Sequence, residues 1–347
     1  MSTTTAPIDS GWRLADLLKR REAVLAFLLI SMMLLIGLRA PVFLSQRNLD
    51  SVLTDSTILV MLAAGQMLVI MTRGIDLSVA SNLALSGMVA ALVQLQFPGL
   101  PIGVPIATAM LVGLTLGAFN GLLVAYVRIP PIVVTLGTMS IYRGLIFVMS
   151  GGGWVTSNQM TDIFLNLPRM RILGLTTMVW CAALVVALVY VFLRHTRYGR
   201  ELYAVGGNPV AARYLGIDLA ARQFMVYCLS GLIAGLCGYL WVARYAIAYT
   251  ELALAFELQV VAACVIGGIS IAGGVGTLGG AVLGALFLSV IYNALPVINV
   301  SPFWQMAIAG VVILVAVAIN ARDEASKTKK ILRESYAGSG KGERTSP

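Results

Sequence analysis

The sequence predicts an all-α polytopic membrane protein with about ten transmembrane helices and with both termini in the cytoplasm. Of its 347 residues, 59% are hydrophobic and only 11% are charged, and the mean hydropathy is +0.90. Soluble domains do not have this composition. Between residues 24 and 320 the chain repeats apolar runs close to the ~20 residues that a helix needs to cross a bilayer.

Each apolar run is taken in order as one span. We predict spans at residues 23–43, 57–72, 77–97, 102–127, 131–149, 173–193, 224–246, 257–272, 275–295 and 303–320. The second, fifth and eighth runs are short, and this length is typical of tilted, broken or re-entrant elements. Basic residues precede the first run, as in a signal peptide. The sequence RAPVF follows it in place of a small-residue cleavage site, so we expect an uncleaved first span.

The basic residues predict the orientation, because Lys and Arg are retained on the cytoplasmic side. With the N-terminus inside, 18 of them are cytoplasmic and five are outside, and Arg143 falls within a span. The chain then divides into a cytoplasmic tail (1–22), a transmembrane domain (23–320) with a cytoplasmic loop at 194–223, and a second cytoplasmic tail (321–347). The net charge of +9 therefore reflects topology and attraction to lipid, and we expect no nucleic-acid binding.

Catalytic and nucleotide-binding patterns are missing from the sequence. No lysine lies between Lys19 and Lys327, so the Gly-rich run at 267–280 is not a phosphate-binding loop. We expect this run to form a sharp reversal with close helix contact. The single histidine, His195, adjoins Arg194 in the basic loop, and all four cysteines fall in apolar runs as packing residues. No catalytic residue, cofactor or metal ion is expected.

Carboxylates in the middle of spans, which proton- and ion-driven transporters usually carry, are also missing. Only Asp76 and Glu257 lie near predicted span ends. The chain can therefore form a pathway, but the sequence shows neither a proton relay nor an ATP site to drive it.

A first set of polar residues that could line a pathway follows Pro131. Thr135, Thr138 and Tyr142 share one helical face, at i, i+3 and i+7. Arg143 follows them and needs a partner or water at membrane depth. In the alternative interpretation the threonines bond carbonyl groups of their own helix and Tyr142 sits at a membrane interface.

A second candidate is the polar break TRGIDLSVAS at 72–81. Asp76 and Ser78 there either cap the following helix or face a polar solute. The lone amides Asn120 and Asn293 are expected to join neighbouring helices.

The polar loop at 194–223 contains the complete signature of a short helix. Asn208 is a good N-cap, Pro209 suits the first helical position and Gly216 suits the C-terminal stop. A helix of about two turns, bounded in this way between membrane spans, favours an element that docks against a partner.

Four segments together resemble the permease subunit of bacterial ATP-binding-cassette (ABC) sugar importers, in the branch with ribose, xylose, rhamnose and autoinducer-2 permeases. They are GQMLVIMTRGIDLSVAS (65–81), IPPIVVTLGTMSIYRGL (129–145), YGRELYAVGGNPVAARYLGI (198–217) and CVIGGISIAGGVGTLGGAVLGAL (264–286). They occur in the expected order over most of the chain. Arg73 stands where many sugar permeases have glycine, which is more similar to autoinducer-2 and rhamnose permeases.

The resemblance implies a complex of two permeases and two ATPases in the bacterial inner membrane, fed by a periplasmic solute-binding protein. The second permease is either another copy or a homologue. A short cytoplasmic helix of such permeases sits in a groove of the ATPase. The pattern G-N-x-x-A-A-R-x-x-G-I resembles that helix and is matched by Gly207, Asn208, Ala211, Ala212, Arg213, Gly216 and Ile217. Val210 stands where the broader motif often has glutamate, so no salt bridge is expected there.

The function that follows is an ATPase-gated pathway for a small neutral sugar or sugar-like solute, with ATP hydrolysis on a separate subunit. Three alternatives stay open: an ion-coupled secondary transporter, a membrane enzyme acting on lipid, and a non-transporting component of a membrane assembly. We expect Ala211 and Ala212 to face the ATPase.

Overall fold

The computed structural model describes residues 21–298 together with residues 304, 307, 310, 311 and 314. Within this part of the chain, eight helices are long and apolar enough to cross a membrane. They are α2 (Arg21–Arg39), α3 (Gln46–Met71), α4 (Val79–Gln96), α5 (Gly103–Ala125), α6 (Pro131–Ser150), α8 (Thr177–His195), α11 (Leu219–Tyr245) and α13 (Leu278–Val297). The all-α fold is confirmed. Most of the predicted span 303–320, all of the tail 321–347 and residues 1–20 of the predicted N-terminal tail lie outside the described residues.

The three runs that are short in the sequence differ in structure. The predicted eighth span is a helix of 11 residues, α12 (Phe256–Ile266), while α6 is a full helix of 20 residues. The second span, predicted at 57–72, is wrong at its start, because α3 begins at Gln46 and has 26 residues. Its first turns carry the hydroxyls of Thr54, Ser56 and Thr57, which donate to carbonyls of the preceding turn. These polar side chains lower the hydropathy of a segment that is nevertheless helical.

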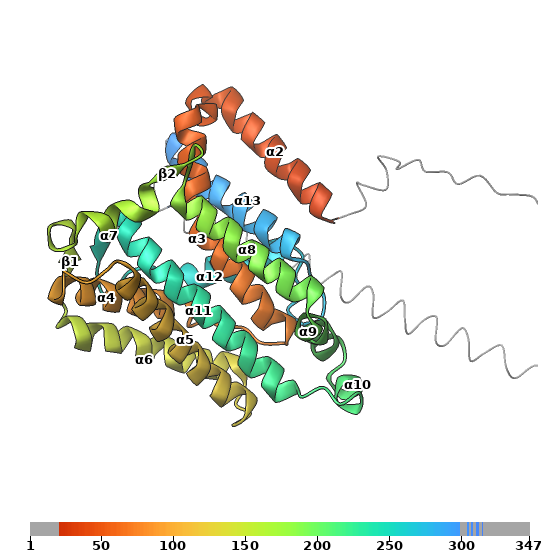
Figure 1. Cartoon of the computed structure of the whole chain (residues 1–347). Helices are drawn as coiled ribbons and strands as arrows, with labels where there is room; N and C mark the ends of the chain where they lie inside the picture. Colours follow the sequence, from red (N-terminus) through yellow and green to blue (C-terminus); the bar gives the residue numbers. More distant parts are fainter. Residues whose placement is uncertain (1–20, 299–303, 305–306, 308–309, 312–313, 315–347) are drawn as a thin grey trace, which may run out of the picture.

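The helix α3 lies at the centre of the bundle (Figure 1) and is almost wholly buried from Ile58 to Met71. It contacts α8, α11, α12 and α13, whereas α4, α5 and α6 form a second group that packs on α11 through α4 and α5. The outermost helix is α2, which packs on α13 and exposes most of its apolar side chains. A helix that is apolar and exposed in this way is suited to contact with lipid.

A close helix contact joins α5 to α11 through glycines. A Cβ atom on Gly113 would lie 2.3 Å from the carbonyl oxygen of Gly231, and one on Gly117 would lie 2.3 Å from that of Tyr227. Any side chain larger than hydrogen would therefore separate the helices. The glycines at every fourth position of α5 thus bring this helix and α11 together.

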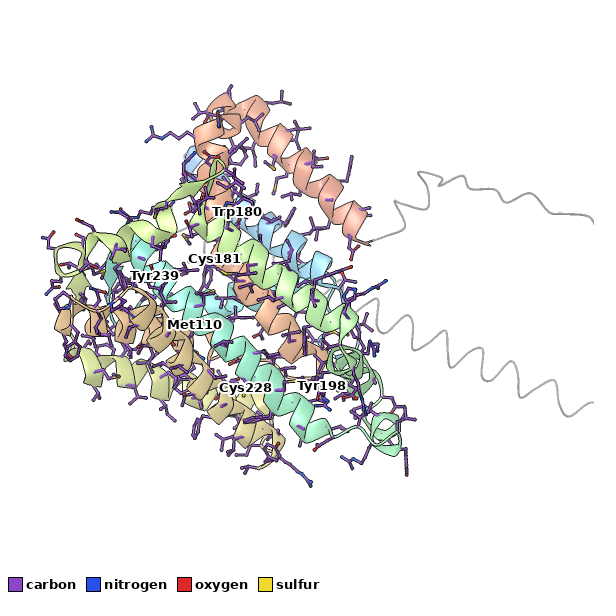
Figure 2. The ribbon with its side chains drawn as sticks, in the orientation of Figure 1. Met110, Trp180, Cys181, Tyr198, Cys228 and Tyr239 are labelled. Atoms are coloured by element: carbon purple, nitrogen blue, oxygen red, sulfur yellow. The ribbon has the colours of Figure 1, made fainter. Side chains whose placement is uncertain are left out.

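The four cysteines are free thiols within helices, and Cys237 and Cys264 are fully buried. Figure 2 shows Cys181 on α8, and Cys228 and Tyr239 on α11. The hydroxyl of Tyr239 donates to the carbonyl of Phe164 at 3.2 Å, and their rings meet edge to face. This contact fixes α7 (Asp162–Asn166) over the end of α11.

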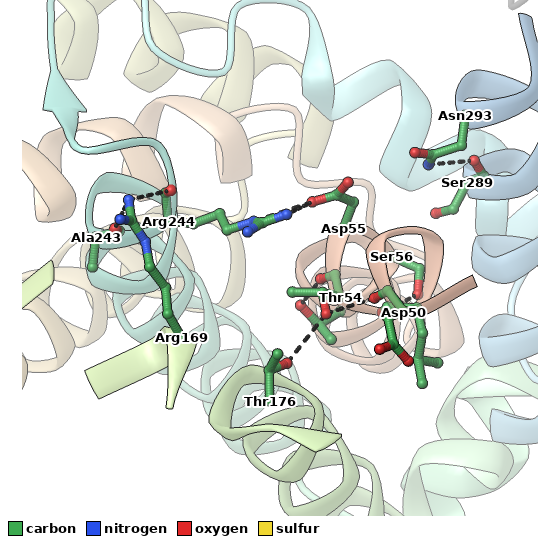
Figure 3. Close-up of polar contacts among 12 residues, drawn as sticks. Asp50, Thr54, Asp55, Ser56, Arg169, Thr176, Ala243, Arg244, Ser289 and Asn293 are labelled. Carbon is green, nitrogen blue, oxygen red and sulfur yellow. Dashed lines mark hydrogen bonds and ion pairs between the residues drawn. The ribbon is translucent and has the colours of Figure 1, made fainter. Parts of the chain in front are cut away.

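Short elements cover one end of the bundle. They are the 3₁₀ helices η1 (Pro41–Leu44), η2 (Ser157–Gln159) and η3 (Leu167–Arg169), and the two-stranded antiparallel pairs β1 (Val155–Thr156) with β4 (Ile247–Ala248) and β2 (Arg171–Ile172) with β3 (Leu175–Thr176). Ion pairs join α3 to the last turn of α11 and to β2 at this end. Arg244 lies 2.9 Å from Asp55 (Figure 3), and Arg171 lies 2.8 Å from Asp50. We expect this end to be periplasmic from the distribution of Lys and Arg.

The opposite end carries α9 (Arg197–Gly207) and α10 (Pro209–Tyr214), together with the Gly-rich turn at 267–277. The residues between α3 and α4 also lie here, because Arg73 bonds to α9. The sequence assigns this end to the cytoplasm.

Candidate coupling segment and polar sites

The helix α10 forms as its capping residues predict. The side chain of Asn208 accepts hydrogen bonds from the backbone N–H groups of Val210 and Ala211, both at 3.1 Å, and Pro209 occupies the first helical position. Gly216 adopts φ +77°, and the N–H of Ile217 returns to the carbonyl of Ala212. A residue with a side chain is strained at such a φ, so Gly216 suits the end of this helix.

The exposed face of α10 differs from the one that the sequence predicts. Ala212 is only 2% exposed and packs against the protein, whereas Ala211 and Arg213 are exposed. The prediction that both alanines face outward is therefore wrong for Ala212. Large apolar side chains fill the outer surface instead, since Tyr214 is 89% and Leu215 78% exposed. Apolar groups exposed at a loop outside the membrane mark a surface for a protein partner.

A single arginine joins this segment to the central helix. Arg73, two residues after the end of α3, donates from Nε to the carbonyl of Gly206 at 2.8 Å and from Nη2 to that of Gly207 at 3.1 Å. Its φ is +64°, a left-handed conformation that aims its side chain at α9. Both acceptors are the last carbonyls of α9, where positive charge is favourable.

The end of α9 also packs directly on the Gly-rich turn and on α3. A Cβ atom on Gly206 would lie 1.9 Å from the carbonyl oxygen of Met71 and 2.3 Å from the backbone nitrogen of Gly274. That nitrogen donates to the same Met71 carbonyl at 3.1 Å. The hydroxyl of Tyr203 donates to the carbonyl of Gly276. The coupling segment, defined here as α9 and α10 (197–214), is thus in close contact with two parts of the bundle, the end of α3 and the Gly-rich turn.

Charge pairs fix the other side of α9. The carboxylate of Glu201 accepts from Arg197 at 2.6 Å and from Arg222, at the start of α11, at 2.5 Å. The Arg222 guanidinium also lies over the ring of Tyr198. Burial alone would raise the pKa of the Glu201 carboxyl, but the hydrogen bonds and charges of Arg222 and Arg197 outweigh burial and hold this pKa below its ordinary value.

Two of the predicted pathway residues meet in a buried polar network at the start of α4. The carboxylate of Asp76 accepts from the backbone and the hydroxyl of Ser78, and the Ser78 hydroxyl accepts from Asn120 on α5 at 2.7 Å. The Ser78 side chain makes no hydrogen bond that caps α4, so the capping interpretation is wrong for this residue. Asn120 joins neighbouring elements, as predicted.

The network continues into α6. The hydroxyl of Tyr142 donates to the carbonyl of Leu116 and lies 3.3 Å from the Asn120 amide oxygen. Tyr142 is only 1% exposed, so its placement at a membrane interface is wrong. Thr135 donates to the carbonyl of Pro131, four residues back, and Thr138 donates to that of Thr135. Both threonines thus bond carbonyls of their own helix, as the alternative interpretation predicts.

Arg143 lies apart from this network. Its guanidinium donates to the carbonyls of Thr250 and Leu252, at 3.3 and 2.6 Å, and so holds the segment between α11 and α12. Backbone carbonyls supply the partner that the sequence requires for this arginine. Of the six candidates, Asp76, Ser78, Thr135, Thr138 and Tyr142 are brought together and Arg143 is not.

A polar cavity of about 560 Å³ lies near the Arg143-bonded segment and was not predicted. It lies between α3, α11, α12 and α13. Its polar and aromatic wall includes Trp241, Tyr245, Tyr249, Gln259, Tyr292 and Asn293. The one signal in the sequence is the spacing of Trp241 and Tyr245 one helical turn apart. Nothing in the sequence places them beside Tyr292 and Asn293, which lie about 50 residues further along.

Comparisons with known proteins identify the family of this chain. A family model described as branched-chain amino acid transport system / permease component matches residues 48–317. The autoinducer 2 import system permease protein LsrC of Escherichia coli O9:H4 (strain HS) is 35% identical over 318 residues, covering 91% of this chain and 92% of that protein. The ribose import permease protein RbsC of Escherichia coli (strain K12) is 36% identical over 323 residues, covering 92% of this chain and 99% of that protein. No solved structure matches the chain.

The chain therefore belongs to this family of transport-system permease components. It is a multi-pass membrane protein, and the resemblance to ABC importer permeases is confirmed.

Proposed function

We propose that this chain is the permease subunit of an ATP-driven importer in the bacterial inner membrane and passes a small neutral sugar or sugar-like solute. ATP hydrolysis takes place on a separate ATPase subunit, and a periplasmic solute-binding protein delivers the solute. A second permease, a copy or a homologue, completes the pathway. The relatives named for ribose and autoinducer 2 support this solute class.

The observation that carries the proposal is the chemistry of the 560 Å³ cavity. Among the described residues, the hydroxyls of Tyr245, Tyr249 and Tyr292 have no hydrogen-bond partner, whereas those of Tyr142, Tyr203 and Tyr239 each donate to a carbonyl. Free hydroxyls beside aromatic rings are suited to a solute that combines hydroxyl groups with an apolar ring face.

The charge of the wall favours a neutral solute over an anion. The cavity is lined by the carboxylates of Asp55 and Glu251, and its lining includes no Lys or Arg among the described residues. Asp55 is neutralised by Arg244 at 2.9 Å. A phosphorylated or carboxylated solute would meet a net negative wall, which disfavours its entry.

ATPase docking is assigned to the outer face of α10. Val210, Tyr214 and Leu215 are exposed there, and Ala211 lies among them. Movement of α10 would pass to α3 through Arg73 and the close contact of Gly206 with Met71. In this way the ATPase would shift the equilibrium between the state of the bundle that is open to the periplasm and the state that is open to the cytoplasm.

The test is transport by proteoliposomes that contain the chain with its ATPase and its solute-binding protein. Uptake of radiolabelled D-ribose, L-rhamnose and L-leucine is measured with ATP either inside or outside the proteoliposomes. We expect uptake of a sugar that requires ATP and survives dissipation of proton and sodium gradients. Uptake of leucine alone would contradict the solute class, and uptake by the chain without ATPase would contradict the mechanism.

The cavity itself is tested by removing only hydroxyl groups. Tyr245→Phe and Tyr249→Phe should each raise the KM for uptake roughly fivefold, the effect of one lost hydrogen bond, with little change in kcat. Tyr126→Phe, which removes an exposed hydroxyl at the opposite end of the bundle, is the matched control. An unchanged KM in both cavity variants would remove this cavity from the pathway.

A further inference from the structure

A second cavity, of about 570 Å³, lies at the end of the bundle that carries the coupling segment. It lies between the first turn of α2, the last turns of α8, the helix α9 and the first turn of α13. Its wall includes Tyr190, Leu193, Arg194, Arg200, Tyr203 and Leu278. None of these residues belongs to the polar network or to the cavity that we assign to the solute.

The two arginines of this wall are without ion-pair or hydrogen-bond partners for their side chains among the described residues. The neighbouring Arg197 and Arg222, in contrast, are both neutralised by Glu201. The one carboxylate of the wall, Glu22, accepts a hydrogen bond from the hydroxyl of Thr277. Two guanidinium groups therefore face a shared space with unused donors, where an anion with several oxygen atoms would be bound by charge-assisted hydrogen bonds.

The surroundings of the cavity place it at the edge of a membrane. Leu184 and Leu188 on α8 are both 60% exposed, and α2 exposes Phe27 and Leu28 within two turns of Glu22. Exposed apolar surfaces on membrane-spanning helices are suited to the hydrocarbon region of a bilayer. Tyr190 is half exposed near the end of α8, a position typical of aromatic residues at the level of lipid headgroups. The arginines follow one turn or more beyond it.

We propose that this cavity binds the phosphate group of an anionic phospholipid from the cytoplasmic leaflet. Arg194 and Arg200 hold the phosphate oxygens, while Leu193, Leu278 and the ring of Tyr190 contact the first part of the acyl chains. Basic pockets between helices at this face of a membrane are suited to anionic headgroups. Because Arg200 and Tyr203 belong to α9, the bound lipid would brace the coupling segment against α13.

The experiment measures lipid binding to the purified full-length chain by native mass spectrometry, with phosphatidylglycerol and phosphatidylcholine as probes. We expect phosphatidylglycerol to bind at least tenfold more tightly than phosphatidylcholine. Each basic residue near an anionic headgroup contributes about fivefold to binding, so Arg194→Gln combined with Arg200→Gln should weaken phosphatidylglycerol binding about thirtyfold. Both side chains are exposed, so the fold is expected to survive these changes.

Arg128→Gln is the matched control, since Arg128 is an exposed arginine at the same end of the bundle and lies outside the cavity. Its phosphatidylglycerol affinity should stay within twofold of the wild type, and Arg194→Lys with Arg200→Lys should retain most of the binding. Equal losses in the Arg128 and cavity variants, or no loss in the cavity variant, would overturn the proposal. Competition by millimolar inorganic phosphate would also overturn it, by identifying free phosphate as the ligand.

Discussion

Arg73 joins the end of the central helix α3 to the coupling segment by donating from Nε to the carbonyl oxygen of Gly206 at 2.8 Å. A second bond runs from its Nη2 to the carbonyl of Gly207. The hydrogen-bonded network of Asp76 and Ser78 begins only three residues after Arg73. The arginine therefore stands between the surface that we assign to the ATPase and the polar network of α4, α5 and α6.

Replacing Arg73 should uncouple ATP hydrolysis from transport. In Arg73→Gln both bonds to α9 are lost, and the α3–α9 contact depends on Gly206 alone. Uptake per ATP hydrolysed should fall roughly tenfold, within the range that residues between coupled sites usually show, while the ATPase still assembles. Solute uptake and ATP hydrolysis are measured in the same proteoliposomes.

Arg73→Gly distinguishes the role of the side chain from that of the backbone conformation, because glycine adopts φ +64° without strain. This variant should keep the backbone conformation of the wild type and yet lose coupling as Arg73→Gln does. Normal uptake per ATP in both variants would show that the arginine contributes only to packing.

The contact between α9 and α3 predicts that substitutions of two adjacent glycines differ in their effect on stability. Gly206→Ala places a Cβ atom 1.9 Å from the Met71 carbonyl oxygen, and this should cost about 3 kcal/mol of stability, at the upper end for overpacking. Gly207→Ala meets no atom within 4 Å and should be neutral. Thermal unfolding of the two variants in detergent measures the difference. A Gly206→Ala protein as stable as Gly207→Ala would contradict the close packing.

The elements that the sequence predicts well are those determined by nearby residues. Asn208, Pro209 and Gly216 bound α10 because caps and stops depend on the backbone within a few positions. The apolar runs locate the spans for the same reason. The sequence does not predict the start of α3, because Thr54, Ser56 and Thr57 lower the hydropathy of this segment. These side chains fit in a buried helix only because their hydroxyls bond to carbonyls of the helix itself.

The parts that the sequence does not predict depend on distant contacts. Arg73 and Gly206 are 133 residues apart, and no local pattern pairs them. The cavity of Tyr245 and Tyr292 needs α11, α12 and α13 to pack around α3. The burial of Ala212 is not predicted by the sequence, because a helix of six residues has too few turns to define an apolar side by periodicity.

The burial of Ala212 gives a pair of substitutions that separates docking from folding. Ala211→Asp puts a carboxylate on the exposed face beside Leu215, so the ATPase should be lost from the purified complex while the permease stays folded. Ala212→Asp buries an unpaired charge and should reduce the amount of folded permease itself. Co-purification with the ATPase and size-exclusion profiles measure the two effects. Retention of the ATPase by Ala211→Asp would move the docking surface away from α10.

The ion pairs of Glu201 predict how the stability of the chain depends on pH. The pKa of its carboxyl is held below the ordinary value by Arg222 and Arg197, so the ionised form is favoured in the folded state. This contribution to stability is fully present above the ordinary glutamate pKa of about 4.3 and is lost as the pH falls through the lowered pKa of the folded state. Glu201→Gln removes the carboxylate and leaves Arg222, whose side chain is 17% exposed, without its anion.

At neutral pH, Glu201→Gln should therefore unfold at a markedly lower temperature than the wild type. The two unfolding temperatures should converge as the pH is lowered from 7 to 3, because the wild-type carboxylate becomes protonated and resembles the amide. Asp218→Asn, which changes an exposed carboxylate in the same loop, controls for the general effect of acid. If the difference between wild type and Glu201→Gln stayed constant down to pH 3, the ion pairs with Arg222 and Arg197 would not stabilise the coupling segment.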